Sequence, residues 1–256
     1  MIPKIIHYCW FGQKPFPELE KQCIESWKKY LPDYELKMWN EQIFDIKSIP
    51  YVQQAYENGK YAFVSDYVRM HALYHYGGIY LDTDVEILKS LDIFLQNEVF
   101  MGFENRTMLG TAVIGAVKNY NVFSEIMNYY QQRDFINNKH QQDTTANPQI
   151  LVDVLLKYGF KKENSEQFIN GIHIYERDIF LPKKLNDGTY RSSERTVSIH
   201  HFSGSWLSER DKKRGTNRFW IEVCRPMLRQ IRLLSLKIFG ENYTKQVEIK
   251  VRNKLR

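Results

Sequence analysis

The first forty residues alternate between short apolar runs and one longer amphipathic segment, which predicts an α/β fold. Residues 2–10 are nearly all apolar, as in a strand buried on both faces. In residues 18–30 the apolar positions recur at helical spacing, and Pro32 ends the pattern. Residues 34–39 return to an alternation with period two. A strand, a helix and a strand in this order indicate a βαβ unit and a parallel sheet.

The rest of the chain is also predicted to contain both helices and strands. Helices are predicted over residues 51–58 and 61–76, the second closed by Gly77-Gly78, which suit a left-handed helix end. The further predicted elements are strands at 85–88, 99–104 and 111–115, helices at 122–133 and 150–158, strands at 172–175 and 196–200, and a long helix at 219–239. We expect one α/β domain over residues 1–207 and a helical extension over 208–256, divided by the charged turn 208–215.

Composition agrees with a folded domain and narrows its setting. The 256 residues are 43% hydrophobic and 14% aromatic, as in a globular protein. The three cysteines have neither a zinc-binding nor a disulfide-framework spacing, which favours reduced thiols in the cytoplasm. The first residues lack the pattern of a signal peptide, and no window approaches 18 uncharged apolar residues. We therefore expect a cytoplasmic protein without a transmembrane helix.

Charge is distributed unevenly along the chain. Residues 210–256 contain 14 Lys and Arg against 4 Asp and Glu, a net charge of +10, whereas the other 209 residues carry −4. Within residues 218–256 the basic side chains are interleaved with apolar ones, which predicts a helix lying on the inner face of the cell membrane. The alternative is a helix packed on the body with a solvated basic rim. Nucleic-acid binding is disfavoured, because the apolar content exceeds what phosphate binding needs.

Two carboxylates follow a short apolar run at residues 79–81. Asp82 and Asp84 are two positions apart, so on a strand they face the same side and could bind one Mn²⁺ or Mg²⁺ ion. Two solvated aspartates at a strand end are the simpler interpretation of the bare motif. On the preceding helix, Asp66 and Arg69 have the spacing of a surface ion pair.

These residues are part of a larger pattern. The segment S-D-x-x-R at residues 65–69, followed by G-G-x-Y-x-D-x-D at 77–84, resembles the retaining sugar-nucleotide glycosyltransferases that carry a D-x-D motif. The most similar group is family 32, which includes capsular-polysaccharide and mannosyltransferase-like enzymes. The glucosyltransferase domain of the large clostridial toxins is more distantly similar. The resemblance implies a GT-A fold, a single Rossmann-like domain with a mixed, mainly parallel sheet.

The resemblance also implies roles for donor-binding residues. Trp10 would stack on the nucleotide base, although a tryptophan at a strand end is as often a core residue. Tyr80 would lie against the ribose. Asp66 would bind hydroxyls of the donor sugar, and Arg69 would reach the sugar and the diphosphate. Asn147 is a candidate for the reacting face of the site, with Thr144 and Thr145 no better placed.

The metal and the late loop complete the implied site. Asp82 and Asp84 would hold Mn²⁺ or Mg²⁺, and His201 would be a third ligand, with His200 as the alternate because a strand presents only one of two neighbours to a site. Without that context, one buried and one exposed structural histidine is the simpler interpretation. Further contacts to the β-phosphate would come from the loop that follows, from Ser203, Ser205 and Trp206.

The predicted function is metal-dependent transfer, with retention, of a hexose or N-acetylhexosamine from a nucleotide-sugar to a lipid-linked bacterial surface polysaccharide. A UDP-sugar is the favoured donor and GDP-mannose the alternative. No Asp or Glu stands out as a nucleophile, which is compatible with front-face attack. A glycoside hydrolase is disfavoured, because Asp82 and Asp84 on one strand cannot flank a bond from both sides. A non-catalytic glycan-binding or membrane-surface protein is the alternative of another class.

Overall fold

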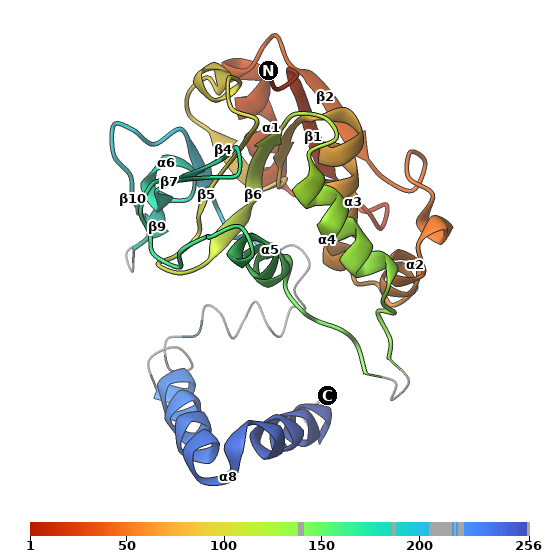
Figure 1. Ribbon diagram of the computed structural model, residues 1–256, viewed down its shortest axis with the longest axis vertical. Coiled ribbons are helices and arrows are strands. Elements are labelled where there is room, and N and C mark those ends of the chain that lie inside the picture. Colours follow the sequence, from red (N-terminus) through yellow and green to blue (C-terminus); the bar gives the residue numbers. More distant parts are fainter. Residues whose placement is uncertain (138–140, 186–187, 205–216, 218, 220–222, 255–256) are drawn as a thin grey trace. The chain divides into compact units, whose positions relative to one another are not determined.

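The computed structural model describes residues 1–137, 141–185, 188–204, 217, 219 and 223–254 (Figure 1). The chain divides into two compact units, Met1–Ser203 and Gly204–Arg256. The domain boundary predicted at residue 207 lies outside the described residues. In the described part of the chain, no helix combines the length and apolar character needed to cross a bilayer.

The first unit is built on a seven-stranded sheet in the order β2-β1-β3-β6-β5-β8-β7. The strands are β1 (Ile5–Cys9), β2 (Glu35–Trp39), β3 (Gly78–Leu81), β5 (Val99–Phe103), β6 (Leu109–Ala116), β7 (Gln167–Ile169) and β8 (Ile172–Tyr175). β1 pairs in parallel with β2 and β3, and β5 with β8, whereas β6 and β7 are antiparallel to their neighbours. Five strands therefore run in one direction and two in the other. The predicted mixed, mainly parallel sheet is confirmed.

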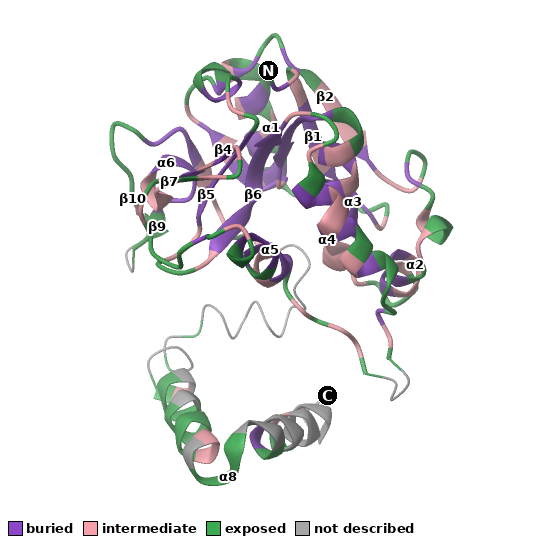
Figure 2. Cartoon of the chain, in the orientation of Figure 1, coloured by how far each residue is buried: buried purple, intermediate pink, exposed green. Residues whose placement is uncertain are grey.

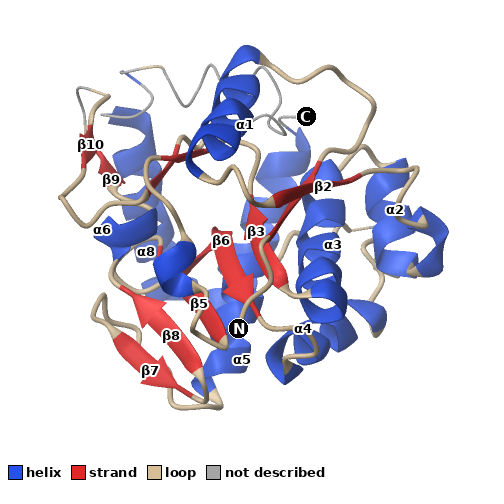
Figure 3. Cartoon of the chain, turned by 90° about the horizontal axis from the view of Figure 1, so that it is seen from above, coloured by secondary structure: helices blue, strands red, loops and turns tan. Residues whose placement is uncertain are grey.

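Helices cover both faces of this sheet (Figure 3). The helices of the first unit are α1 (Glu18–Tyr30), α2 (Pro50–Glu57), α3 (Tyr61–Tyr76), α4 (Asn121–Gln131), α5 (Asn147–Leu156) and α6 (Arg177–Phe180), with 3₁₀ turns at Ile46–Ser48 and Asp92–Phe94. Alternation along β3 divides the core in two. Tyr80 joins the apolar cluster of α2 to α5, whereas Ile79 and Leu81 join that of α1 and α6. Figure 2 shows the buried strands between these two layers.

The turn between α3 and β3 depends on its two glycines. Gly77 and Gly78 have φ angles of +66° and +100°, a region that side chains other than glycine rarely adopt. The N–H of Gly77 donates to the carbonyl of Leu73, as the predicted helix end requires. A Cβ on Gly78 would lie 2.6 Å from the Ile5 carbonyl oxygen. The glycine pair therefore ends the helix and brings β3 against β1.

Smaller strands lie beside the sheet. β4 (Val85–Ile87) pairs antiparallel with β11 (Ser198–His200), and β9 (Lys183–Lys184) with β10 (Tyr190–Arg191). β7 was not expected from the sequence, because its three residues are half-buried or exposed and carry no apolar alternation. α5 begins at Asn147, three residues before the predicted start, with Pro148 in its first turn.

The second unit contains α8 (Arg225–Lys254), which is interrupted at Gly240. Gly240 has φ and ψ of 74° and 176°, a conformation that glycine adopts readily. The two arms contact each other across the break through the Arg232–Glu248 ion pair and the Ser235–Thr244 hydrogen bond, both 2.8 Å long. The helix predicted over 219–239 thus ends next to this break, and a second helical arm that was not predicted follows it. Its large exposed apolar residues include Met227, Leu228, Ile231, Leu233, Leu234, Ile238, Phe239, Tyr243 and Val247.

Candidate active site

The D-x-D residues lie at the carboxyl end of β3, near the middle of the sheet. The N–H of Asp82 donates to the Ala112 carbonyl of β6 over 2.9 Å, which continues the ladder by one residue. The N–H of Val85 then donates to the Asp82 carbonyl over 3.0 Å, closing a tight turn that contains Asp84. Backbone hydrogen bonds therefore fix the segment that carries both carboxylates, at the edge where open α/β sheets bind ligands.

Asp82 is held by residues of α3 and β3. Its Oδ1 accepts hydrogen bonds from Arg69 Nη2 over 2.7 Å and from the Tyr80 hydroxyl over 3.0 Å. The Arg69 guanidinium also lies 4.4 Å from the centre of the Tyr80 ring. Among the described residues no hydrogen bond reaches Asp82 Oδ2. One oxygen of Asp82 is therefore engaged, and the other is available to a metal ion or a ligand.

Arg69 is the centre of a buried network. Its side chain is 5% exposed, and Nη1 donates to Asp66 Oδ1 over 3.0 Å and to Asn147 Oδ1 over 3.1 Å. Burial alone lowers the pKa of Arg69, but the charges of Asp82, Tyr80 and Asp66 outweigh it and raise the pKa. Burial raises the pKa of Asp66 to about 6, although Arg69 opposes this shift. The guanidinium is thus charged and fixed in place.

Asn147, the predicted residue of the reacting face, lies behind Arg69. It is 1% exposed, and its amide donates to the Tyr130 hydroxyl over 2.8 Å while its carbonyl accepts from Arg69. Tyr130 belongs to α4 and was not among the expected site residues; a tyrosine at a buried position of an amphipathic helix gives no signal of such a role. The structure therefore gives Asn147 a positioning contact to Arg69.

Asp84 lies in a second group, which we call the His200 cluster: Asp84, His200 and Ser203. His200 Nε2 donates to Asp84 Oδ1 over 3.2 Å, and the Ser203 N–H donates to Oδ2 over 2.8 Å. Burial raises the pKa of Asp84, but the hydrogen bond and charge of His200 outweigh it and lower the pKa. Burial likewise lowers the pKa of His200, and Asp84 raises it above the ordinary value. The pair is therefore stabilised as an ion pair.

Asp82, Asp84 and His200 could hold a metal ion. One ligand atom from each lies within 4.8 Å of the others. Two carboxylates and one imidazole suit Mn²⁺, and Mg²⁺ accepts such carboxylates as well. His200 Nδ1 is buried without a hydrogen-bond partner in the described part of the chain, so the ring makes its one polar contact toward Asp84. The donor set therefore fits the implied cofactor.

The neighbouring histidine points elsewhere. His201 Nε2 lies 3.0 Å from Glu86 Oε2, and its Nδ1 lies 3.2 Å from the Tyr190 hydroxyl. Adjacent residues of an extended segment face opposite sides, so only one of the pair can face Asp84. The structure places the alternate, His200, in the group that could hold a metal ion, and His201 outside it.

Of the other residues that the resemblance implied, the structure describes Trp10 and Ser203. Trp10 follows β1, stacks on Phe16 at 4.4 Å between ring centres, and donates its indole N–H to the Lys14 carbonyl. Because β1 and β3 are parallel neighbours, Trp10 and Asp82 follow strands that end at the same edge of the sheet. Ser203 Oγ donates to the buried Glu20 of α1 over 2.9 Å, a contact that the sequence did not suggest. Ser205 and Trp206 lie outside the described residues.

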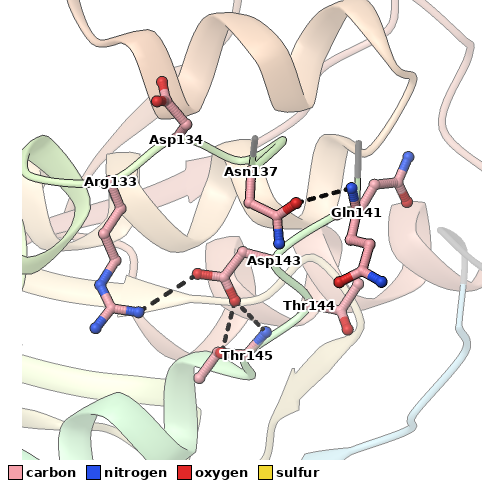
Figure 4. A pocket seen from close by; sticks show the side chains of 8 residues that line it. Arg133, Asp134, Asn137, Gln141, Asp143, Thr144 and Thr145 are labelled. Carbon is pink, nitrogen blue, oxygen red and sulfur yellow. Dashed lines mark hydrogen bonds and ion pairs between the residues drawn. The ribbon is translucent and has the colours of Figure 1, made fainter. Parts of the chain in front are cut away.

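A polar pocket, referred to below as the hollow, lies beside the segment that leads into α5 (Figure 4). Arg133 and Asp143 face each other across it at 3.7 Å, and Thr145 donates to Asp143 over 2.6 Å. Its lining is Arg133, Asp134, Asn137, Gln141, Gln142, Asp143, Thr144 and Thr145. The two threonines considered for the reacting face therefore line this hollow, and both precede Asn147 in the chain.

Comparison with known proteins places the D-x-D residues in a known region. Residues 17–101, 85 of the 256, match the family described as glycosyltransferase sugar-binding region containing DXD motif. The chain is 32% identical over 127 residues to inositol phosphoceramide mannosyltransferase 3 of Schizosaccharomyces pombe, covering 46% of this chain and 34% of that protein. It is 28% identical over 138 residues to mannosyl phosphorylinositol ceramide synthase SUR1 of Saccharomyces cerevisiae, covering 52% and 36%. The chain thus spans about a third of the length of these relatives.

Solved structures give weaker likenesses. PaToxG glycosyltransferase is 22% identical with a TM-score of 0.46, covering 61% of this chain and 68% of that one. The galactosyltransferase LgtC, solved with donor and acceptor sugar analogues, is 14% identical with a TM-score of 0.42, covering 78% and 87%. The family match carries the conclusion, because it contains Asp66, Arg69, Asp82 and Asp84. Over residues 17–101 the chain is thus similar to the DXD-containing sugar-binding region of glycosyltransferases, the enzyme class predicted from the sequence.

Proposed function

We propose that the protein is a metal-dependent retaining glycosyltransferase of the GT-A type. The observation that carries the proposal is the convergence of Asp82, Asp84 and His200 within 4.8 Å at the carboxyl end of β3, beside the charged Arg69. A sugar diphosphate leaves with negative charge, and an arginine and a cation site are the groups that stabilise such charge. The arrangement therefore suits the loss of a nucleotide diphosphate from a sugar.

The metal would be held by Asp82, Asp84 and His200. When bound, a divalent cation neutralises charge on the departing diphosphate. His200 has to give up its proton to become a ligand, because only the neutral imidazole offers a lone pair. The Ser203 N–H keeps its contact with Asp84 Oδ2 and so orients that carboxylate. These residues bind and orient the leaving group.

The chain's other side chains would position the donor. Trp10 would stack on the base and Tyr80 would lie against the ribose, as the family resemblance implies. Arg69 would donate to the sugar and the diphosphate, and Asp66 would accept from sugar hydroxyls. Asn147 and Tyr130 hold Arg69 from behind, so that little reorganisation is needed when the donor binds.

The acceptor hydroxyl would attack from the side on which the nucleotide leaves. The carboxylates of Asp66, Asp82 and Asp84 each accept from a fixed partner, which makes them poor nucleophiles. The departing phosphate can accept the acceptor's proton in such front-face attack. This proposal keeps the anomeric configuration without a covalent sugar–enzyme intermediate.

For the donor we propose a hexose or N-acetylhexosamine nucleotide, tested first as UDP-sugars. The curated relatives are named mannosyltransferases, which supports GDP-mannose as the second donor to test. Incubating the protein with UDP-glucose, UDP-N-acetylglucosamine and GDP-mannose, with and without Mn²⁺, would measure nucleotide release. Metal-dependent release from one donor class supports the proposal. A protein that binds glycans but never releases nucleotide would be a binding module instead.

For the acceptor we propose a lipid-linked sugar of a bacterial surface polysaccharide, reached from the inner face of the cell membrane. The relatives' names specify inositol phosphoceramide, a lipid with a hydroxylated headgroup. Residues 218–256 contain exposed apolar side chains such as Ile231, Leu234 and Ile238 among many basic residues, as in helices that lie on anionic bilayers. Co-sedimentation with phosphatidylglycerol vesicles, but not phosphatidylcholine vesicles, would support this contact. Equal recovery in both supernatants would contradict it.

A further inference from the structure

Glu104 is a carboxylate near the site that has no role in the function proposed above. It directly follows β5, and β5 runs in the same direction as β3, because both pair antiparallel with β6 between them. Glu104 and Asp82 therefore both follow the carboxyl ends of strands, at the same edge of the sheet. In the order of the sheet, β5 lies on the side of β3 opposite to β1, the strand that leads to Trp10.

Alternation along β5 gives the face on which Glu104 lies. Phe100 packs in the cluster of α1 and α6, and a Cβ on Gly102 would lie 2.9 Å from the ring of Phe180 in α6. Glu104 lies in the bend after β5, and a Cβ on Gly110 would meet both Leu181, which belongs to the same apolar cluster, and the Glu104 Cβ at 3.6 Å, so Glu104 lies on this side as well. That side carries Arg177, the first residue of α6, and His200, the last residue of β11, which packs on α6 through Ser198. Burial raises the pKa of Glu104, and the charges of His200 and Arg177 act against this shift.

The other carboxylates around the site each have a partner. Asp66 and Asp82 contact Arg69, Asp84 contacts His200, Glu86 contacts His201, and Glu20 contacts Ser203. Among the described residues, no side chain forms a hydrogen bond or ion pair with the carboxylate of Glu104. The carboxylate oxygens of Glu104 are not among the buried polar atoms that lack a partner, so in the described part of the chain they are accessible to a ligand.

We propose that Glu104 accepts a hydrogen bond from a hydroxyl group of the acceptor sugar and so holds the acceptor beside the transferred sugar. The inference rests on the proposed function. With the base on Trp10 at β1 and the diphosphate at β3, the transferred sugar extends toward β6 and β5, which is where the acceptor must approach. A carboxylate is an acceptor-only group and sugar hydroxyls are donors, so the chemistry is complementary. No proton or covalent transfer to Glu104 is involved.

The test compares Glu104→Gln with a matched control, Glu98→Gln, at the exposed amino end of the same strand. With Mn²⁺ and the donor that the wild type hydrolyses, two rates are measured: release to water, and transfer to octyl glycosides of glucose, mannose and N-acetylglucosamine. Titration of the same glycosides into protein loaded with Mn²⁺ and nucleotide gives affinity without turnover. We expect Glu104→Gln to raise the KM for the glycosides, and to lower their affinity, by about 10-fold or more. Donor hydrolysis should stay within about twofold, and Glu98→Gln should change neither.

Three outcomes would overturn the inference alone. Equal loss of hydrolysis and transfer in Glu104→Gln would place the residue against the donor, and unchanged glycoside affinity would remove it from the site. A wild type that hydrolyses its donor but binds none of the glycosides would also contradict it. A wild type without metal-dependent nucleotide binding would overturn the proposed function and this inference together. Thermal unfolding of both variants checks that the isosteric changes leave the fold intact.

Discussion

Asp82 and Asp84 are two positions apart, yet they belong to regions of opposite character. Asp82 is part of the Arg69 network, defined here as Asp66, Arg69, Tyr80, Asp82 and Asn147, in which a 5%-exposed guanidinium binds three side chains. Asp84 belongs to the His200 cluster, where one imidazole and one backbone N–H are its partners. The first region is fixed before any ligand arrives. The second is held by an ion pair that a metal ion can replace, because imidazole and carboxylate are both metal ligands.

The largest effect is expected from removing the guanidinium at the centre of the Arg69 network. Arg69→Met leaves Asp66 and Asp82 without their buried counter-charge, which should lower the free energy of unfolding by about 3–5 kcal/mol. Urea unfolding measures this change. Arg195→Met, which removes an exposed ion pair with Glu176, is the control and should cost about 0–1 kcal/mol. Equal costs for both variants would show that the network is not preorganised.

The second effect tests the His200 cluster. Asp84→Asn keeps the shape of the side chain but removes the charge that pairs with His200 and would bind the metal. We expect Mn²⁺-dependent nucleotide release to fall about 10²–10³-fold, as when one preorganised electrostatic contact is lost. Glu86→Gln, two residues further and paired with His201, should retain most of the rate. An Asp84→Asn protein with the wild-type rate would remove this carboxylate from the metal site.

The third effect is a pH dependence of stability that belongs to Asp66 of the Arg69 network. Because burial raises the pKa of Asp66 to about 6, the folded protein binds this proton more tightly than the unfolded chain, whose value is 3.8. The contribution of Asp66 to stability should therefore decrease as the pH rises from about 4 to about 6, by up to roughly 3 kcal/mol. In Asp66→Asn, the free energy of unfolding should no longer decrease as the pH rises across this range. A slope that persists in the variant would assign it to other groups.

The fourth and smallest effect sharpens the role of Asn147. Asn147→Ala leaves Tyr130 and one contact of Arg69 without a partner, which should cost about 1–3 kcal/mol of stability. If Asn147 acts by positioning Arg69, donor KM should rise more than the rate falls. Tyr130→Phe, which removes the outer hydrogen bond alone, should show the same pattern more weakly. A loss of rate with unchanged donor KM in Asn147→Ala would indicate direct contact with the reacting atoms.

The sequence predicted the parts of this site that depend on neighbouring residues. The glycine turn, the strand that precedes Asp82 and the shared face of Asp66 and Arg69 follow from local periodicity and helix-end chemistry. The contacts of Asn147 with Arg69 and of Ser203 with Glu20 span 78 and 183 residues, and no local pattern encodes them.

The orientation and order of the strands also limited what could be predicted from the sequence. The choice between His200 and His201 depends on which side of β11 faces Asp84, and the residues around the pair do not determine this. Glu104 follows a predicted strand, but its importance depends on the strand order, which places β5 two positions from β3. The predicted helix ended at residue 239, next to the break at Gly240, and the arm of α8 that follows Gly240 was missed.

In the proposed function, Asp82, Asp84 and His200 form a metal site that binds the diphosphate of a nucleotide-sugar. Isothermal titration of UDP and GDP into the protein, with and without Mn²⁺, tests it most directly, with Asp84→Asn as the matched variant. We expect one nucleotide to bind only when Mn²⁺ is present, and we expect Mn²⁺ to bring about no binding of that nucleotide to Asp84→Asn. Binding of either nucleotide with the same affinity in the absence of Mn²⁺, or no binding at all, would contradict it.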